Sequence, residues 1–181
     1  MLHIIRRVSS FHLSVLLLSL LSFQAIALDN DTEQPLNIVS KEQIADFNSN
    51  KAIFLENVLA TQGTIEVHAD KAEITRDSND QLEEIVAYGK PATYKQLQEN
   101  GKIIHSQSSI IHYLHKKNLL ILIGRATIWQ ENSHVDGERI EYNTITKQLK
   151  ATNENSQDGR VQSTFIPQEL KSDGNKDKNQ K

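Results

Sequence analysis

A short pattern that recurs along the chain constrains this sequence more than any other feature. It reads small residue, polar, any, apolar, any, apolar, and its clearest copy runs from Ala69 to Ile74. Further copies begin at Ser108 and Gly137, and a degenerate copy begins at Ser40, so the starts are 29, 39 and 29 residues apart. Spacing of this kind indicates a repeated supersecondary unit, which cannot bury its apolar face alone.

A second pattern accompanies the first at steps of 34 residues. Its copies are Val58-Leu59-Ala60, Ala92-Thr93-Tyr94 and Ala126-Thr127-Ile128. The outer two positions of each copy are apolar or aromatic, and a period of two places them on one face of a strand. The repeated unit is therefore predicted to be a pair of strands that recurs about four times.

Turn-forming groups separate the segments and favour an all-β fold. Clusters of Asn, Asp, Ser and Gly recur at short intervals from residue 48 onward. Asn100-Gly101 is the strongest hairpin signal, and we expect a type I′ turn there. Leu119 to Ile123 is apolar on both faces and is expected to be the most buried strand. Pro91 predicts a bulge or kink, whereas Gln81 to Ala87 is too short to favour a helix.

The two ends of the chain differ in composition from the centre. Residues 1–27 combine Arg6 and Arg7 with an apolar run and a small-x-small site at Ala25 to Ala27, which predicts a cleaved signal peptide. The alternative is a retained membrane anchor, although the strongly apolar part is shorter than the roughly 20 residues of a spanning helix. We expect one domain over residues 28–170 and a disordered tail over residues 171–181.

Composition and motifs exclude several functions. Without Arg6 and Arg7, 18 basic residues face 23 acidic ones, a net charge of −5 that argues against a nucleic-acid partner. The sequence has no cysteine, and it contains no phosphate loop or dinucleotide fingerprint. His112 and His115, His68 and Asp70, and His134 and Asp136 form weak pairs without an activated nucleophile. We therefore predict no enzyme activity, no metal site and no cofactor.

The repeat itself remains as the candidate functional feature. Stacked strand over strand, the alternate small, aliphatic and aromatic positions make one continuous apolar face. Such a face is most often an ordinary core. A sheet with one apolar side must fold over on itself, however, and it leaves an apolar trough if its edges do not close.

The order of several motifs resembles one known family. These motifs are Gln34 to Ile38, Glu56-Asn57-Val58, Thr61 to Ile65, Ala69-Asp70-Lys71, Tyr88 to Thr93, Gln96, Asn100 to Lys102, His112-Tyr113, Gly124-x-Ala126 and Gly137 to Tyr142. Together they resemble the LptA family of periplasmic lipopolysaccharide transport proteins, in the OstA-like group. The resemblance spans about Gln34 to Leu170. The sequence departs from the family at Glu56-Asn57-Val58, where the family has Gly-Asn-Val, and at Ser108-Ser109, where it has Ala-Ser.

The resemblance implies an open, twisted antiparallel β-jellyroll whose V-shaped interior holds the acyl chains of lipid A. It also implies head-to-tail stacking into a periplasmic bridge between the inner-membrane LptC side and the outer-membrane LptD translocon. From alternation and the resemblance together, the expected lipid-binding residues are Leu36, Ile38, Phe47, Phe54, Val58, Ile74, Tyr94, Tyr113, Ile128 and Tyr142.

The edges of the sheet give a further expectation. The first strand, around Leu36 to Ser40, and the last strand, around Val161 to Ile166, should carry unpaired backbone groups that pair between molecules. Two other classes stay open. One is a membrane-anchored relative of the LptC type, and the other is a periplasmic enzyme that uses the His and Asp pairs.

Overall fold

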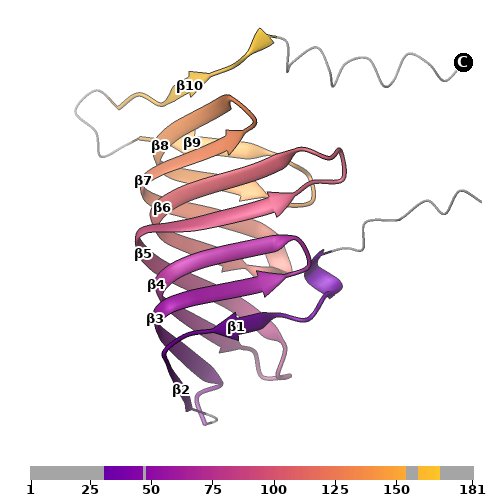
Figure 1. The fold of residues 1–181 in the computed structure, drawn as a ribbon, viewed down its shortest axis with the longest axis vertical. Coiled ribbons are helices and arrows are strands. Elements are labelled where there is room, and N and C mark those ends of the chain that lie inside the picture. The colour runs from indigo at the N-terminus through magenta and orange to yellow at the C-terminus, as the bar shows by residue number, and fades with distance from the viewer. Residues whose placement is uncertain (1–30, 47, 154–158, 168–181) are drawn as a thin grey trace, which may run out of the picture.

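The computed structural model describes residues 31–46, 48–153 and 159–167. The described chain is almost entirely β-structure, in agreement with the predicted fold class (Figure 1). Its elements are η1 (Asp31–Glu33), β1 (Asn37–Val39), β2 (Glu42–Asp46), β3 (Lys51–Gln62), β4 (Ile65–Arg76), β5 (Leu82–Leu97), β6 (Ile103–Leu114), η2 (His115–Lys117), β7 (Leu119–Gln130), β8 (Ser133–Asn143), β9 (Leu149–Thr152) and β10 (Gln162–Thr164).

All the strands belong to one antiparallel sheet that does not close into a barrel. The order is β1-β3-β4-β5-β6-β7-β8-β10, with β2 also paired to β3 and β9 also paired to β8. Each long strand from β3 to β8 pairs with its neighbour in sequence, so the sheet is a meander of hairpins stacked along the long axis (Figure 1).

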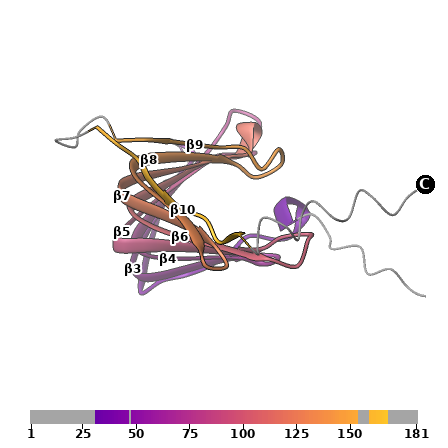
Figure 2. The same ribbon diagram turned by 90° about the horizontal axis from the view of Figure 1, so that it is seen from above.

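A row of β-bulges bends the sheet lengthwise. Register shifts interrupt the pairing near the middle of β3 to β8, between Leu55 and Val58, His68 and Lys71, Tyr88 and Ala92, Gln107 and Ile110, and Ile123 and Ala126. Bulges bend the strands that carry them. Viewed from above, the sheet is accordingly a V of two flaps joined along one crease and open on the other side (Figure 2).

The two sequence patterns meet along this crease. Ala69 pairs with Val58, Ser108 with Ala92, and Gly137 with Ala126, so the start of each of the three clear copies of the first pattern lies opposite the start of a copy of the second. The repeat in the sequence therefore encodes the bend as well as the strands.

Each end of the sheet carries two short edge strands, one on each flap. At one end, β1 pairs with residues 59–61 of β3, whereas β2 pairs with residues 51–55 on the other side of the bulge. At the opposite end, β10 pairs with residues 134–136 of β8 and β9 pairs with residues 139–142. We name the flap that carries β1 and β10 the first flap, and the flap that carries β2 and β9 the second flap.

The local predictions are largely confirmed, with one correction. Leu120, Ile121 and Leu122 are all at most 5% exposed, as expected for the most buried strand. The bulge predicted at Pro91 is present, and Gln81 to Ala87 forms no helix.

The prediction of a type I′ turn at Asn100-Gly101 is wrong. Gly101 has a φ of 80°, but Asn100 does not have a positive φ. Hydrogen bonds from Gly101 N to Gln98 O and from Gln98 N to Lys102 O close a loop of three residues. Such a loop takes a type I turn followed by a left-handed residue, so only the glycine needs a positive φ.

Three predictions lie outside the described residues: the signal peptide over residues 1–27, Phe47 and the tail over residues 171–181. Within the parts of the chain that the structure does describe, no helix is both long and apolar enough to cross a membrane.

A candidate lipid trough between two flaps

The inner faces of the two flaps form a trough whose lining changes from the crease to the open side. On the first flap the residues nearest the crease are small or short, and all are at most 9% exposed: Val58, Ala69, Ala92, Ser108 and Ala126. The next row outward contains Val67, Tyr94 and Ile128, and the rim contains glutamines. The trough thus has short side chains at its base, whereas its rim alternates glutamines with Ile65 and Ile104.

The second flap supplies larger apolar side chains. Phe54, Ala72, Ala87, Ile111, Leu122 and Ile140 pair in one row across β3 to β8, and all are at most 7% exposed. Ile74, Ile85, Tyr113, Leu120 and Tyr142 pair in the next row. Both rows are continuous through the sheet, so the apolar surface runs along the length of the molecule.

The structure distributes the expected lipid-binding residues over two chambers of this trough. Leu36, Ile38, Val58, Tyr94 and Tyr113 line the chamber nearer β1. Ile128 and Tyr142 line the chamber nearer β10. Phe54 belongs to the core cluster, Ile74 packs against it, and neither lines a chamber. That these residues bind lipid stays a prediction.

The two chambers differ in size. The chamber nearer β1 has a volume of about 100 Å³, and we name it the narrow chamber. The chamber nearer β10 has about 540 Å³, and we name it the wide chamber. Gln98, Glu99 and Lys147 line both chambers, so these residues mark the boundary.

A row of glutamines along the rim of the first flap was missed in the sequence analysis. Gln62, Gln96 and Gln130 lie 34 residues apart, each four residues after the start of a copy of the second pattern. Gln62 and Gln96 are each 9% exposed. The signal was present in the sequence, because extending the pattern by two residues would have included these side chains on the same face.

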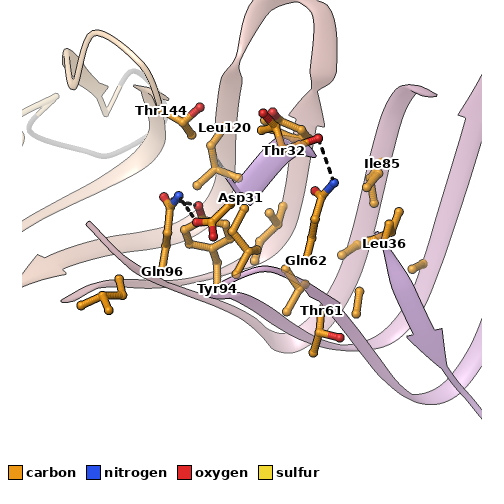
Figure 3. Close-up of a pocket in the computed structure, with 18 of the residues that line it drawn as sticks. Asp31, Thr32, Leu36, Thr61, Gln62, Ile85, Tyr94, Gln96, Leu120 and Thr144 are labelled. Carbon is orange, nitrogen blue, oxygen red and sulfur yellow. Dashed lines mark hydrogen bonds between the residues drawn. The ribbon is translucent and has the colours of Figure 1, made fainter. Parts of the chain in front are cut away.

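The turn η1 lies at the open side of the V, where the glutamine row holds it (Figure 2). Asp31 is 6% exposed, and its carboxylate accepts hydrogen bonds from Thr64 N (2.6 Å), Thr64 Oγ1 (2.8 Å) and Gln96 Nε2 (2.7 Å). Gln62 Nε2 donates to the carbonyl oxygens of Gln34 (2.9 Å) and Thr32 (3.3 Å). Figure 3 shows Asp31 and Thr32 entering the pocket above Tyr94 and Gln62.

A hydrogen bond joins the two flaps at the boundary of the chambers. Gln98, which follows β5, donates from Nε2 to the hydroxyl of Tyr142 on the second flap at 2.8 Å. Gln130 Nε2 in turn donates to Gln98 Oε1 at 2.5 Å. Gln98 and Tyr142 are 6% and 2% exposed, so this bond lies away from water. We name the Gln98–Tyr142 pair the clasp.

Burial affects the ionisation of the tyrosines in the trough. It raises the pKa of Tyr142 to about 12, although the hydrogen bond from Gln98 acts in the opposite direction. Burial also raises the pKa of Tyr94 and of Tyr113 above that of a free tyrosine. All three side chains are therefore neutral hydrogen-bonding groups at physiological pH.

A carboxylate contacts each of His68, His112 and His134. His68 contacts Glu66 (2.6 Å), and His112 contacts Glu84 (2.8 Å). His134 lies 3.5 Å from Asp136, as the shared strand face predicted. Among the residues that the structure places, no group of three or more His, Asp or Glu side chains could hold a metal ion.

Comparisons with known sequences identify the family. The profile of the family described as "LptA/(LptD N-terminal domain) LPS transport protein" matches residues 37–148. The lipopolysaccharide export system protein LptA of Escherichia coli K12 is 38% identical over 156 residues, which cover 86% of this chain and 83% of that protein. LptA of Haemophilus influenzae is 35% identical over 153 residues, or 83% of this chain and 88% of the relative.

A solved structure agrees with these sequence matches. The crystal structure of LptH, the LptA homologous periplasmic component of the lipopolysaccharide transport device of Pseudomonas aeruginosa, superposes with a TM-score of 0.70 at 25% identity. The match covers 76% of this chain and 99% of that chain. The matched relatives are transport proteins, which agrees with the prediction that the chain is not an enzyme. On these grounds the chain belongs to the LptA/(LptD N-terminal domain) family of LPS transport proteins.

Proposed function

We propose that this protein transports lipopolysaccharide through the periplasm by holding its acyl chains in the trough between the two flaps. The observation that carries the proposal is the pair of continuous apolar rows in an open V. Each buried CH₂ group is worth about 0.8 kcal/mol, so several acyl chains exposed to water would cost tens of kcal/mol, in order of magnitude. An apolar trough lowers this barrier without chemistry.

The predicted signal peptide and the relatives support a periplasmic location. Residues 1–27 have the charged start, apolar run and small-x-small site of a cleaved leader. N-terminal sequencing of the protein recovered from periplasm is expected to start at Leu28. Recovery of the uncleaved chain in the membrane would favour an anchored component of the LptC type.

We also propose that copies stack head to tail into a bridge. Both ends of the sheet offer two short edge strands, β1 and β2 at one end and β9 and β10 at the other. Each edge strand has one row of backbone groups outside the sheet, which a second antiparallel strand can pair with. The same edges would join the bridge to the LptC side at the inner membrane and to LptD at the outer membrane.

A photo-crosslinking experiment tests lipid binding. A benzophenone amino acid at Tyr113, whose side chain faces the narrow chamber, is expected to form adducts with lipopolysaccharide. The matched control is the same group at Tyr88, which lies on the outer face within 5.4 Å of Lys71 Nζ. Equal labelling at both positions would contradict a binding site inside the trough.

Substitution at the edge tests stacking. Ile38 on β1 pairs with Ala60 and lines the narrow chamber, so Ile38→Glu places a charge at the joint between two troughs. We expect this variant to remain monomeric in light scattering at concentrations where the unsubstituted protein forms oligomers, and to lose lipid transfer. Unchanged oligomers and unchanged transfer would contradict the bridge.

A further inference from the structure

The narrow chamber has little free volume while η1 lies in it. Its volume is about 100 Å³, compared with roughly 150 Å³ for an engineered apolar cavity that accepts benzene. Displacement of part of its lining would give an acyl chain more room. Asp31 and Thr32 of η1 are the lining residues that belong to no strand and lie nearest the N-terminal end of the described chain.

The acceptor groups of η1 and of Gln34 receive hydrogen bonds from donors on the first flap. Gln62 donates to two backbone carbonyls, of Thr32 and Gln34, and Gln96 and Thr64 donate to the carboxylate of Asp31. Carbonyl and anionic oxygens are also the groups that stand at the head of a fatty acyl chain. The two glutamine donors lie among the apolar residues that line the narrow chamber, such as Tyr94 and Ile85 (Figure 3).

The fit of Asp31 into this donor set is close. Gly63 stands at the turn before Thr64 with a φ of 57°, and a Cβ atom there would meet Asp31 Oδ1 at 2.3 Å. A carboxylate that accepts three hydrogen bonds in a buried place is strongly held, because bonds to a charged acceptor are stronger than neutral ones. The turn at Gly63 therefore leaves space for an oxygen and not for a side chain.

We propose that Gln62, Thr64 and Gln96 form a polar subsite for the carbonyl or anionic oxygens at the head of a fatty acyl chain, and that η1 occupies this subsite until a lipid displaces it. This inference rests on the proposed function, because it assumes that acyl chains enter the trough. It assigns Asp31 the role of an internal competitor and Gln96 the role of a ligand-binding residue. The two roles predict opposite effects of substitution.

The test measures the affinity of single-chain amphiphiles that share a twelve-carbon tail. Dodecyl phosphate is compared with dodecyltrimethylammonium by titration against the complete mature protein. Asp31→Ala is expected to tighten binding of dodecyl phosphate about threefold to tenfold, because it removes a competitor that lowers the fraction of open sites. Gln96→Leu is expected to weaken the binding of dodecyl phosphate by a similar factor. It should leave the affinity for dodecyltrimethylammonium unchanged.

Two control variants separate the subsite from general effects. Glu33→Ala removes the same charge from an exposed position of the same turn, and Gln107→Leu changes an exposed glutamine on the outer face of β6. Both are expected to bind dodecyl phosphate as the unsubstituted protein does. In the double variant Asp31→Ala with Gln96→Leu, the gain from Asp31→Ala should be largely lost.

Displacement of η1 has its own readout. The chain contains no cysteine, so Glu33→Cys gives a single attachment point for a nitroxide label. The electron paramagnetic resonance spectrum of this label is expected to show greater mobility when purified lipopolysaccharide is bound. Unchanged affinity in Asp31→Ala, unchanged head-group preference in Gln96→Leu, or an unchanged label with lipopolysaccharide bound would each overturn the inference. Absence of any lipopolysaccharide binding would instead refute the proposed function.

Discussion

Tyr142→Phe removes one hydroxyl group and with it the clasp between the flaps. The phenyl ring keeps its place in the apolar row, because only the oxygen is lost. The consequence falls on Gln98, whose Nε2 donates to this oxygen at 2.8 Å and whose side chain is 6% exposed. Gln98 Oε1 still accepts from Gln130, so a single buried donor loses its partner.

The size of the effect follows from that single donor. A buried donor left without a partner costs about 1–3 kcal/mol. Gln98 and Tyr142 also line the wide chamber, where the side chain of Gln98 has room to readjust, so we expect a loss in the lower half of this range, about 1–2 kcal/mol. The total free energy of unfolding of a protein is about 5–15 kcal/mol, so the loss of one oxygen atom would remove a large fraction of it.

Urea unfolding followed by circular dichroism measures the loss. With a slope of about 2 kcal/mol/M, the middle of the usual range for urea, the transition midpoint should fall by roughly 0.5–1 M. Tyr88→Phe is the matched control, since Tyr88 lies on the outer face beside Lys71, and it should stay within about 0.5 kcal/mol of the unsubstituted protein.

A second substitution tests the mechanism and not only the magnitude. Gln98→Leu removes the donor, so adding Tyr142→Phe to Gln98→Leu should cost much less than Tyr142→Phe costs alone. Nitroxide labels at Asn100→Cys and Thr146→Cys, on the loops that end the two flaps, should report a broader distance distribution once the clasp is lost. Our reasoning would be refuted if Tyr142→Phe matched Tyr88→Phe in both assays.

Three further predictions concern the crease, the core and pH. Gly89→Ala should destabilise the fold by more than about 2 kcal/mol in urea unfolding, because its Cβ would meet Ala92 N at 2.4 Å. Leu122→Ala, at a side chain with 0% exposure, should cost about 2–5 kcal/mol in the same assay. Stability should hold up to pH 10 and fall between pH 10 and about pH 12, because the raised pKa of Tyr142 means that the unfolded chain loses its proton first. The fall should be shallower in Tyr142→Phe, when unfolding is measured as a function of pH.

The strand repeat could be predicted because it depends on local alternation. Val58, Ala92 and Ala126 start segments with period two, and that period fixes which side chains share a face whatever the tertiary structure. The bulges were predicted only at Pro91, since a proline disrupts a ladder by itself. At Glu56, where the family has glycine, the residue takes a φ of 59°, which its side chain disfavours and which local sequence therefore does not indicate.

Other features depend on contacts between distant residues. Asp31 reaches Gln96, 65 positions away, so nothing near Asp31 in the sequence shows that its carboxylate is buried. The doubled edges were missed for a related reason. Strands β2 and β9 are short, and each exists because one half of a bent neighbour offers a separate row of backbone groups.

The gradient across the trough explains how one surface can serve as a core and still stay open. Short side chains at the crease, such as Ala92 and Ala126, let the flaps approach closely there and bury the base of the V. Larger side chains farther out keep the flaps apart, because Tyr94 and Tyr113 fill more space than the alanines beneath them. At the mouth, glutamines alternate with Ile65 and Ile104 from strand to strand, so closure over the rim would bury polar groups that need partners. Hydrogen bonds to η1 and across the clasp satisfy some of these groups in the structure. Opening at the rim would therefore break hydrogen bonds such as the clasp, whereas the buried apolar rows nearer the crease would keep their contacts.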